Sequence, residues 1–424
     1  MNKINSVLKE VLPFAKPSDK EMNEIKEKLN AFLKKIDANR KKARINAQIF
    51  VGGSWAKGTI IKKDSYDIDI FVRFDKKYRD SMLSDITEKM LKGQKAERIH
   101  GSRDYFKIKS EDGLFFEIIP VKMVNNPKEA ENVTDLSYSH VNYIKKKIKT
   151  QKILDEIRLA KAFCYANNAY GAESYIRGFS GYAIELLVNY YGSFLRFVNA
   201  IAKIKEKEVI DIEKLYKNKS QILMDINEAK LKSPIILIDP TYKQRNVLAA
   251  LSDETLKRFQ KSCIEFIKNP SANFFRIEAV DIKKIIADSK KKGLEFVLLD
   301  ISTNKQKGDI AGSKLLKFYR HLNNEILGFF EIKAKGFEYF GEKRARAFFV
   351  VKSKGSFIAK GPKVNDEKNA RKFRLKHKII SIKNGHLYSK IKADYFLNDF
   401  LMRWKAKNMK IIKDMSITGL NVHE

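Results

Sequence analysis

Cysteine is nearly absent from this chain, because Cys164 and Cys263 are the only two in 424 residues. Two cysteines make neither the disulfide framework of a small secreted domain nor a zinc cluster. The sequence also lacks the roughly eighteen consecutive apolar residues that a membrane helix needs. Its start shows no signal-peptide pattern. These absences favour a soluble protein of the cytoplasm that does not enter a membrane.

Acidic residues are the minority among the charged ones. The 51 Asp and Glu face 85 Lys and Arg, which gives a formal net charge of +34 and an isoelectric point near 9.8. Hydrophobic residues still make up 44% of the chain, so it can bury real cores. A surplus of this size in a folded protein indicates a polyanionic partner such as nucleic acid. Lysine that merely coats an ordinary surface is the alternative.

The length of the chain predicts two or three domains, because 424 residues exceed one typical core. Strand and helix patterns mix in residues 1–142, where Ser18 and Glu21 form a capping box that starts a helix. Residues 143–269 are predominantly helical in pattern. Basic and apolar blocks alternate in residues 270–424, which favours strands mixed with helices. We therefore predict an α+β protein with three parts.

The most informative motif is Gly53-Ser54 followed by Asp67-Ile-Asp69. Side chains alternate along a strand, so both aspartates lie on one face. Two carboxylates so close repel each other unless a cation such as Mg²⁺ lies between them. Gly53 lets the backbone approach a ligand closely, and Ser54 offers a hydroxyl and an N–H to phosphate oxygens. The pair indicates metal-assisted nucleotide chemistry, whereas each half alone also fits a turn or a solvated polar face.

Glu117 lies inside an apolar strand, Leu114–Val121. A buried acid is costly without a partner, so we predict that Glu117 is a third metal ligand. A surface acid on an edge strand is the alternative.

Several further motifs follow one another in a fixed order along the middle of the chain. They are Glu117-Ile-Ile-Pro120, Asp135 with His140, Tyr170-Gly-Ala-Glu173 with Gly178-Phe-Ser-Gly-Tyr182, and the segment 238–252 that contains Arg245. Together with the Gly-Ser and Asp-x-Asp pair, they closely resemble archaeal-type, class I, CCA-adding enzymes. These are tRNA nucleotidyltransferases of the DNA polymerase β-like superfamily. The resemblance covers roughly residues 49–252, and the last third is similar only in length and basic character.

The resemblance implies a polymerase β-like nucleotidyltransferase head (1–142), a helical central domain that contributes nucleotide contacts (143–269) and a mixed α/β RNA-binding region (270–424). It implies that the carboxylates bind Mg²⁺ ions that activate the RNA 3′-hydroxyl and neutralise the departing pyrophosphate. It also implies site residues in two groups: catalytic and metal-binding Asp67, Asp69 and Glu117, and nucleotide-binding Gly53, Ser54, His140, Lys161, Tyr170 and Arg245.

Each of the nucleotide-binding residues also has a structural interpretation. Lys161 alone would be a solvated lysine, Tyr170 a core residue and His140 a structural histidine. The resemblance instead implies that these three and Ser54 donate hydrogen bonds to the triphosphate. Arg245 would belong to the nucleobase pocket.

The sequence departs from the family pattern at three places. Glu117 stands where the family usually has Asp, which places the carboxylate one methylene further out. The Arg commonly found after Asp135 is missing, which removes a phosphate contact. The loop before Asp67 is basic, with Lys62 and Lys63. None of these departures abolishes the chemistry.

The resemblance implies the addition of C, C and A to the 3′ end of tRNA from CTP and ATP, without a nucleic-acid template. The acceptor and TΨC arm of the tRNA would bind the basic C-terminal region, and a homodimer is one candidate assembly. A poly(A) polymerase or another terminal RNA nucleotidyltransferase is a rival interpretation. A catalytically silent RNA-binding protein on the same scaffold is another.

Overall fold

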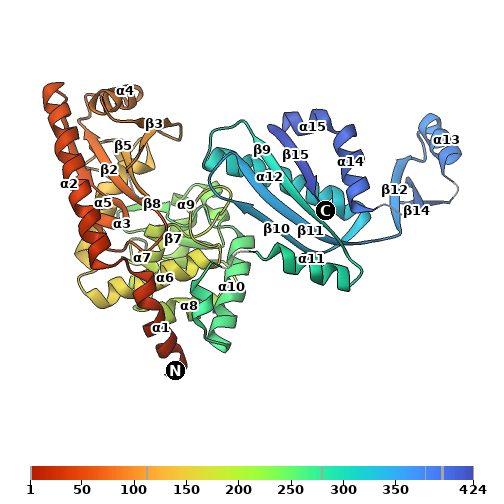
Figure 1. The fold of residues 1–424 in the computed structure, drawn as a ribbon, viewed down its shortest axis with the longest axis horizontal. Coiled ribbons are helices and arrows are strands. Elements are labelled where there is room, and N and C mark those ends of the chain that lie inside the picture. Colours follow the sequence, from red (N-terminus) through yellow and green to blue (C-terminus); the bar gives the residue numbers. More distant parts are fainter. Residues whose placement is uncertain (1, 111–112, 278–279, 378, 393–395, 424) are drawn as a thin grey trace. The chain divides into compact units, whose positions relative to one another are not determined.

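The computed structural model describes residues 2–110, 113–277, 280–377, 379–392 and 396–423. The chain divides into two compact units, Met1–Glu278 and Ala279–Glu424, and both contain helices and sheets (Figure 1). Within these described ranges, no helix has the length and apolar character needed to cross a membrane.

A five-stranded mixed sheet forms the first part of unit 1, in the order β1-β2-β5-β4-β3. Its two central strands, β2 and β5, run parallel, and every other pairing is antiparallel. This is the mixed α and β head that the sequence predicts. The strands are β1 (Ala47–Val51), β2 (Tyr66–Phe74), β3 (Ala96–Ile99), β4 (Tyr105–Lys109) and β5 (Leu114–Lys122); the helices are α2 (Asp19–Lys42), α3 (Gly53–Ala56) and α4 (Asp80–Met90), followed by the short helices η1 (Pro127–Glu129) and η2 (Val133–Leu136).

Helices α2 and α4 cover one face of this sheet, and Figure 1 shows them beside its orange strands. The Ser18 side chain accepts from the Glu21 N–H at 3.2 Å and Glu21 accepts from the Ser18 N–H at 2.8 Å, which confirms the predicted capping box. The rings of Phe32 and Phe116 stack at 4.5 Å in the core below α2. Because the apolar residues of β2 and β5 point to these helices, the acids between them point to the opposite face.

The rest of unit 1 is a helical assembly around a large core of aromatic residues. Phe163 lies at its centre and contacts the rings of Phe194, Phe259 and Phe266. Helix α1 also packs into this core through Val7, rather than onto the head sheet. The helices are α1 (Asn2–Ala15), α5 (Ser137–Lys147), α6 (Gln151–Ala166), α7 (Gly181–Tyr191), α8 (Phe194–Lys203), α9 (Lys219–Asp225), η3 (Glu228–Lys232), α10 (Asp253–Lys268) and η4 (Ala272–Phe275).

The pattern of residues 143–269 predicts helices with few breaks, and the structure differs from this prediction in one respect. A three-stranded sheet lies among the helices, made of β6 (Glu208–Ile210), β7 (Ile235–Asp239) and β8 (Tyr242–Asn246). All five residues of β7 are buried. A short run that is buried on both faces has no alternation, so periodicity cannot distinguish it from a buried helix.

Unit 2 mixes strands and helices, as the alternating blocks predict. A four-stranded antiparallel sheet, β10-β11-β9-β15, packs one face on α12 and α14. A separate three-stranded sheet, β12-β14-β13, carries α13. The strands are β9 (Glu295–Thr303), β10 (Phe330–Tyr339), β11 (Arg344–Ser353), β12 (Ser356–Lys363), β13 (Ile380–Lys383), β14 (His386–Lys392) and β15 (Ile417–His423); the helices are α11 (Ile282–Lys291), α12 (Asp309–Phe329), α13 (Glu367–Lys376), α14 (Leu397–Lys407) and α15 (Met409–Asp414).

A buried ion pair joins the head sheet to the segment that enters α5. Arg103 donates to Asp135 at 2.5 Å, and Asp135 also accepts from the backbone N–H of Lys122 at 2.8 Å. Asp135 therefore has a structural role here, with Arg103 as its cationic partner.

Replacing Asp135 by Ala is expected to lower the free energy of unfolding by about 2 to 4 kcal/mol, because Arg103 keeps Asp80 as a partner but loses its buried one, and the Lys122 N–H loses its acceptor. Urea denaturation followed by fluorescence measures this loss. The matched control is Asp37→Ala, which removes a more exposed ion pair with Arg40 and is expected to cost less than about 1 kcal/mol. Equal losses in the two variants would contradict the prediction.

Candidate active site

Three acids lie on the face of the head sheet that α2 and α4 leave free. Asp67 and Asp69 come from β2, and Glu117 comes from the neighbouring strand β5. The two strands pair in parallel, with Asp69 directly opposite Glu117. The structure thus brings the three predicted carboxylates together on one face, and the extra methylene of Glu117 does not separate it from Asp69.

The electrostatics of these acids show how strongly they affect one another. Burial and the Glu117 carboxylate raise the pKa of Asp69 to about 7, with a smaller contribution from Asp67 and an opposing one from Lys57. Burial and Asp67 likewise raise the pKa of Glu117. Negative charge is therefore unfavourable at this face, and a cation with oxygen ligands would relieve it.

Lys107 supplies part of the missing positive charge. Its ammonium group donates to Asp67 Oδ1 at 2.7 Å and to Glu117 Oε1 at 3.0 Å. Burial acts to lower the pKa of Lys107, but Glu117 and Asp67 outweigh it and raise the pKa. Lys107 faces Glu117 across the β4–β5 pairing, so the register of this hairpin was the signal that the sequence analysis missed.

The fit of a divalent ion follows from the donor chemistry. Three carboxylates supply the hard oxygen ligands that Mg²⁺ prefers. In the described part of the chain, no three His, Cys, Asp or Glu side chains are arranged as a ready cage for a metal. The Lys107 ammonium lies between Asp67 and Glu117. The residue types fit a divalent ion, which would displace this ammonium group or share the carboxylates with it.

Gly53 is required by its closeness to the carboxylates. It adopts a φ of +58°, and a Cβ atom there would lie 1.7 Å from Asp69 Oδ2. The backbone N–H of the preceding Gly52 donates to the Asp69 carbonyl at 2.8 Å. The glycine pair thus brings the start of α3, whose second residue is Ser54, against Asp69.

A second cluster joins the head to the helical part of unit 1. Glu185 of α7 accepts from Lys161 of α6 at 2.7 Å and from Lys57 at 2.6 Å, and Thr59 donates to it at 2.5 Å. Burial acts to raise the pKa of Glu185, but Lys161 and Lys57 outweigh it and lower the pKa to about 2. Burial lowers the pKa of Lys161 to about 8, against the effect of Glu185. The ion pair is therefore charged at neutral pH.

The predicted contact residue Lys161 is almost fully enclosed in this cluster, with 1% of its side chain exposed. Tyr170 lies next to it, because the first residue of α7, Gly181, has the Tyr170 hydroxyl 3.0 Å and the Lys161 ammonium 3.7 Å from its Cβ position. Burial, followed by Glu185, raises the pKa of Tyr170. The Lys63 ammonium lies 5.1 Å from the Tyr170 ring centre, so the basic loop before Asp67 reaches this cluster.

A third cluster brings His140 and Arg245 onto one carboxylate. Asp239 at the end of β7 lies 3.0 Å from His140 Nε2 and accepts from Arg245 at 2.7 Å. Tyr182 stacks on the His140 ring at 4.2 Å and also donates to Asp239 at 3.2 Å. Burial acts to raise the pKa of Asp239, but His140 and Arg245 outweigh it and hold the pKa well below its usual range. Burial lowers the pKa of His140, which Asp239 opposes.

Lys57 connects the three clusters. It bonds to Glu185, and its charge also acts on Asp69 and on His140. The sequence analysis missed Lys57, although it follows Ser54 by three residues. It also missed Glu185 and Asp239. Glu185 is an acid within an apolar helix, the same signal that singled out Glu117.

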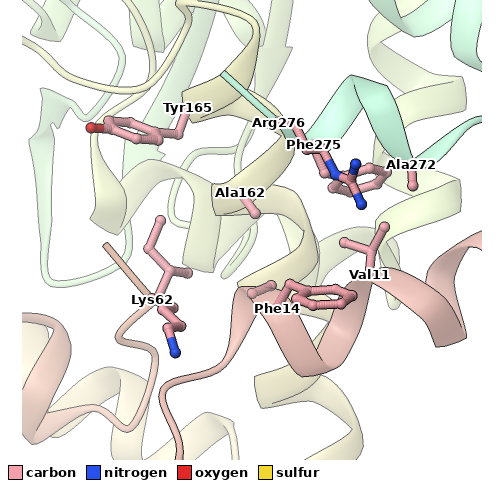
Figure 2. Close-up of a pocket in the computed structure, with 10 residues that line it drawn as sticks. Val11, Phe14, Lys62, Ala162, Tyr165, Ala272, Phe275 and Arg276 are labelled. Carbon is pink, nitrogen blue, oxygen red and sulfur yellow. The ribbon is translucent and has the colours of Figure 1, made fainter. Parts of the chain in front are cut away.

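The small pocket shown in Figure 2 borders the second cluster through Tyr165, whose ring meets that of Tyr170 edge-on at 6.1 Å. It has a volume of about 80 Å³ and lies between α1, α6 and η4. Phe14 and Val11 of α1 face Phe275 across it, and Lys62 and Arg276 lie at its edges. None of the predicted site residues lines it, so we interpret it as a gap in the packing of α1.

Comparison with known proteins assigns each half of unit 1 to a protein family. Residues 29–155 match the family described as nucleotidyltransferase domain, and residues 155–276 match the second domain of tRNA nucleotidyltransferases. The chain is 37% identical over 281 residues to the CCA-adding enzyme of Nanoarchaeum equitans, which covers 66% of this chain and 67% of that one. The chain belongs to the CCA-adding enzyme family. A relative with wider coverage is the CCA-adding enzyme of Methanocaldococcus jannaschii, 29% identical over 92% of this chain and 88% of its own.

Solved structures confirm the fold of the nucleotidyltransferase head and of the helical part of unit 1. A cytoplasmic RNA terminal U-transferase superposes with a TM-score of 0.51 at 15% identity, over 66% of this chain and 100% of that one. The terminal uridylyl transferase Cid1 gives a TM-score of 0.50 at 15% identity, over 64% of this chain and 98% of its own. At this level of identity the likeness concerns the fold alone.

Proposed function

We propose that this chain adds C, C and A to the 3′ end of tRNA from CTP and ATP, without a nucleic-acid template. The relatives named CCA-adding enzyme and the match to tRNA nucleotidyltransferases support this function. The observation that carries it is the row of Asp67, Asp69 and Glu117 on one face of the head sheet. The cluster around Glu185 and the cluster around Asp239 belong to the same compact unit.

In the proposed reaction, the 3′-oxygen of the tRNA bonds to the α-phosphorus, and the bond to the leaving pyrophosphate breaks. Divalent ions, with Mg²⁺ as the proposed metal, supply Lewis acidity to the hydroxyl and charge neutralisation to the phosphates. Asp67, Asp69 and Glu117 would hold the ions. Asp69 and Glu117, which face each other across β2 and β5, would lie on either side of the attacking hydroxyl.

Ser54, His140, Lys161 and Tyr170 are the proposed contacts of the triphosphate, with Gly53 allowing the close approach. Lys161 would exchange one of its bonds to Thr59 or Glu185 for a bond to phosphate. Their hydroxyl, imidazole and ammonium groups are donors suited to phosphate oxygens. Arg245 is the proposed base-pocket residue, since its planar guanidinium can meet the edge of cytosine or adenine. Its bond to Asp239 supports a fixed orientation for that group.

Unit 2 is the proposed binding region for the acceptor and TΨC arm of tRNA. Its 33 Lys and Arg against 15 Asp and Glu support phosphate contacts to an A-form helix. The cytoplasm is the proposed location, which suits two cysteines that are buried and unbridged. A homodimer is the candidate assembly, and sedimentation distinguishes it from a monomer.

Supplying a tRNA that ends just before CCA, with CTP alone, is expected to add two cytidines. ATP alone is expected to add no adenosine, because the adenosine follows the second cytidine. Gel analysis of labelled tRNA resolves each added nucleotide. A tRNA that already ends in CCA is the control and is expected to remain unextended. Extension with ATP alone would support a poly(A) polymerase instead, and no extension with any nucleotide would refute the proposal.

A further inference from the structure

The Glu185 side chain is fully buried, and each of its two carboxylate oxygens accepts a hydrogen bond from a lysine ammonium group. Lys161 and Thr59 donate to Oε1 at 2.7 and 2.5 Å, and Lys57 donates to Oε2 at 2.6 Å. Lys57 and Thr59 belong to the head, whereas Lys161 and Glu185 belong to α6 and α7. The carboxylate therefore ties the loop after α3 to the helical part of unit 1.

The ammonium group of Lys161 has all of its protons in use. It donates to the Thr59 carbonyl at 3.2 Å, to the Thr59 hydroxyl at 2.8 Å and to Glu185 at 2.7 Å. An ammonium group has three donors, so a direct bond to a phosphate would require Lys161 to give up one of these partners. As arranged, Lys161 fixes Oε1 of Glu185 and, with it, the orientation of the whole carboxylate.

The ammonium group of Lys57 is placed differently. Among the described residues, its hydrogen bond is the one to Glu185, which leaves two protons for a ligand. The Lys57 side chain is 8% exposed, and its ammonium group lies 5.7 Å from the centre of the Tyr182 ring, which stacks on His140. The nearby Gly53 packs against Asp69, so Lys57 lies close to both the carboxylate row and His140, in keeping with its electrostatic effect on Asp69 and His140.

We propose that Glu185 is a positioning residue for the incoming nucleotide, whose carboxylate is locked by Lys161 and Thr59 and holds the Lys57 ammonium toward the triphosphate. This inference rests on the proposed function, because it concerns the same triphosphate site. The competing explanation is a structural ion pair that only holds α7 in place. Buried ion pairs are weak evidence of stability by themselves, so the two explanations must be separated by nucleotide binding.

The test compares Glu185→Gln with the unchanged protein. The neutral amide keeps the shape but loses the charge that orients Lys57. The expected result is a rise of about tenfold in both the KM and the equilibrium Kd for CTP, the size typical of one charge-assisted hydrogen bond. The kcat and the Kd for tRNA should change by no more than about threefold, since the carboxylate row and unit 2 are untouched. Glu185→Asp, which keeps the charge, should recover part of the CTP affinity.

The matched control is Glu156→Gln on α6, the same helix as Lys161. Glu156 accepts from the backbone N–H of Phe194 at 2.8 Å and holds the start of α8, away from Lys57. It is expected to lower the midpoint of thermal unfolding and to leave the Kd for CTP unchanged. A Glu185→Gln protein that behaves like this control would overturn the positioning role.

A milder variant keeps the proposal testable if Glu185→Gln does not fold. Thr59→Val removes one hydrogen bond to the carboxylate and is expected to raise the Kd for CTP by about threefold. An unchanged Kd in this variant would count against the proposal. Because CTP binding is measured without tRNA, a protein that binds CTP normally but never extends tRNA would refute the proposed function and leave the comparison of variants intact.

Discussion

Replacing Asp69 by Asn is expected to reduce nucleotide addition by at least about 1,000-fold, the upper range for single electrostatic groups at a reacting centre. The amide keeps the volume of the side chain beside Gly53 but removes the charge that a divalent ion requires. Burial and Glu117 already raise the pKa of Asp69 to about 7, so a neutral group at this position is compatible with the fold. Single-turnover addition of labelled CMP to tRNA measures the loss.

Two controls accompany the Asp69 variant. Asp85→Asn removes a carboxylate of the same domain that is 66% exposed and bonded to Arg98, and activity should stay within about twofold. Filter binding should show that Asp69→Asn retains its tRNA affinity, because unit 2 is unchanged. An Asp69→Asn protein that adds CMP within tenfold of the normal rate would contradict the assignment of the carboxylate row.

The affinity for tRNA is expected to fall by about 1,000-fold between 50 and 200 mM salt, as for proteins that contact six or more phosphates. More than half of the net charge of +34 lies in unit 2, which has 18 more basic than acidic residues in about a third of the chain. Each contact releases condensed counterions, so the slope of log affinity against log salt counts the contacts. Titration of tRNA at four salt concentrations gives the slope, and a flat response would exclude this mode of binding.

Arg344 offers a way to assign part of that slope to one surface. It lines an open pocket of about 450 Å³ on the β9, β11 and β15 sheet, together with Arg346 and the exposed Phe340. Arg344→Gln should reduce the slope by about one if the group contacts a phosphate. Lys35→Gln on the exposed face of α2 is the matched control, since α2 belongs to the other unit.

The sequence predicted the local features of the head well, because they depend on neighbours in the chain. Alternation along β2 correctly placed Asp67 and Asp69 on one face, and Glu117 of the apolar strand β5 lies directly opposite Asp69, while its role as a metal ligand stays a prediction. The partners that organise the site come from distant segments. Lys57 and Glu185 are 128 residues apart and meet only when the head packs on α7. The hydrophobic periodicity of the sequence cannot predict a contact between such distant residues.

The same reasoning explains the error in the central region. The strand β7 is buried on both faces, so its pattern matched that of a buried helix. Its end carries Asp239, which holds His140 and Arg245 together. A helix at this position would not have suggested that pairing. The resemblance to a known family placed His140 and Arg245 in the site, but the residue that joins them became visible only in three dimensions.

Lys107 on β4 affects how a metal ion could bind to this protein. An ion at the proposed site would not meet unopposed negative charge, because the single charge of Lys107 already offsets part of the charge of Asp67 and Glu117. Binding of a divalent ion there would then have to displace Lys107 or share the carboxylates with it. The affinity for the ion would be lower than three unopposed acids would give. A bound triphosphate would favour the ion, because it adds negative charge to the site.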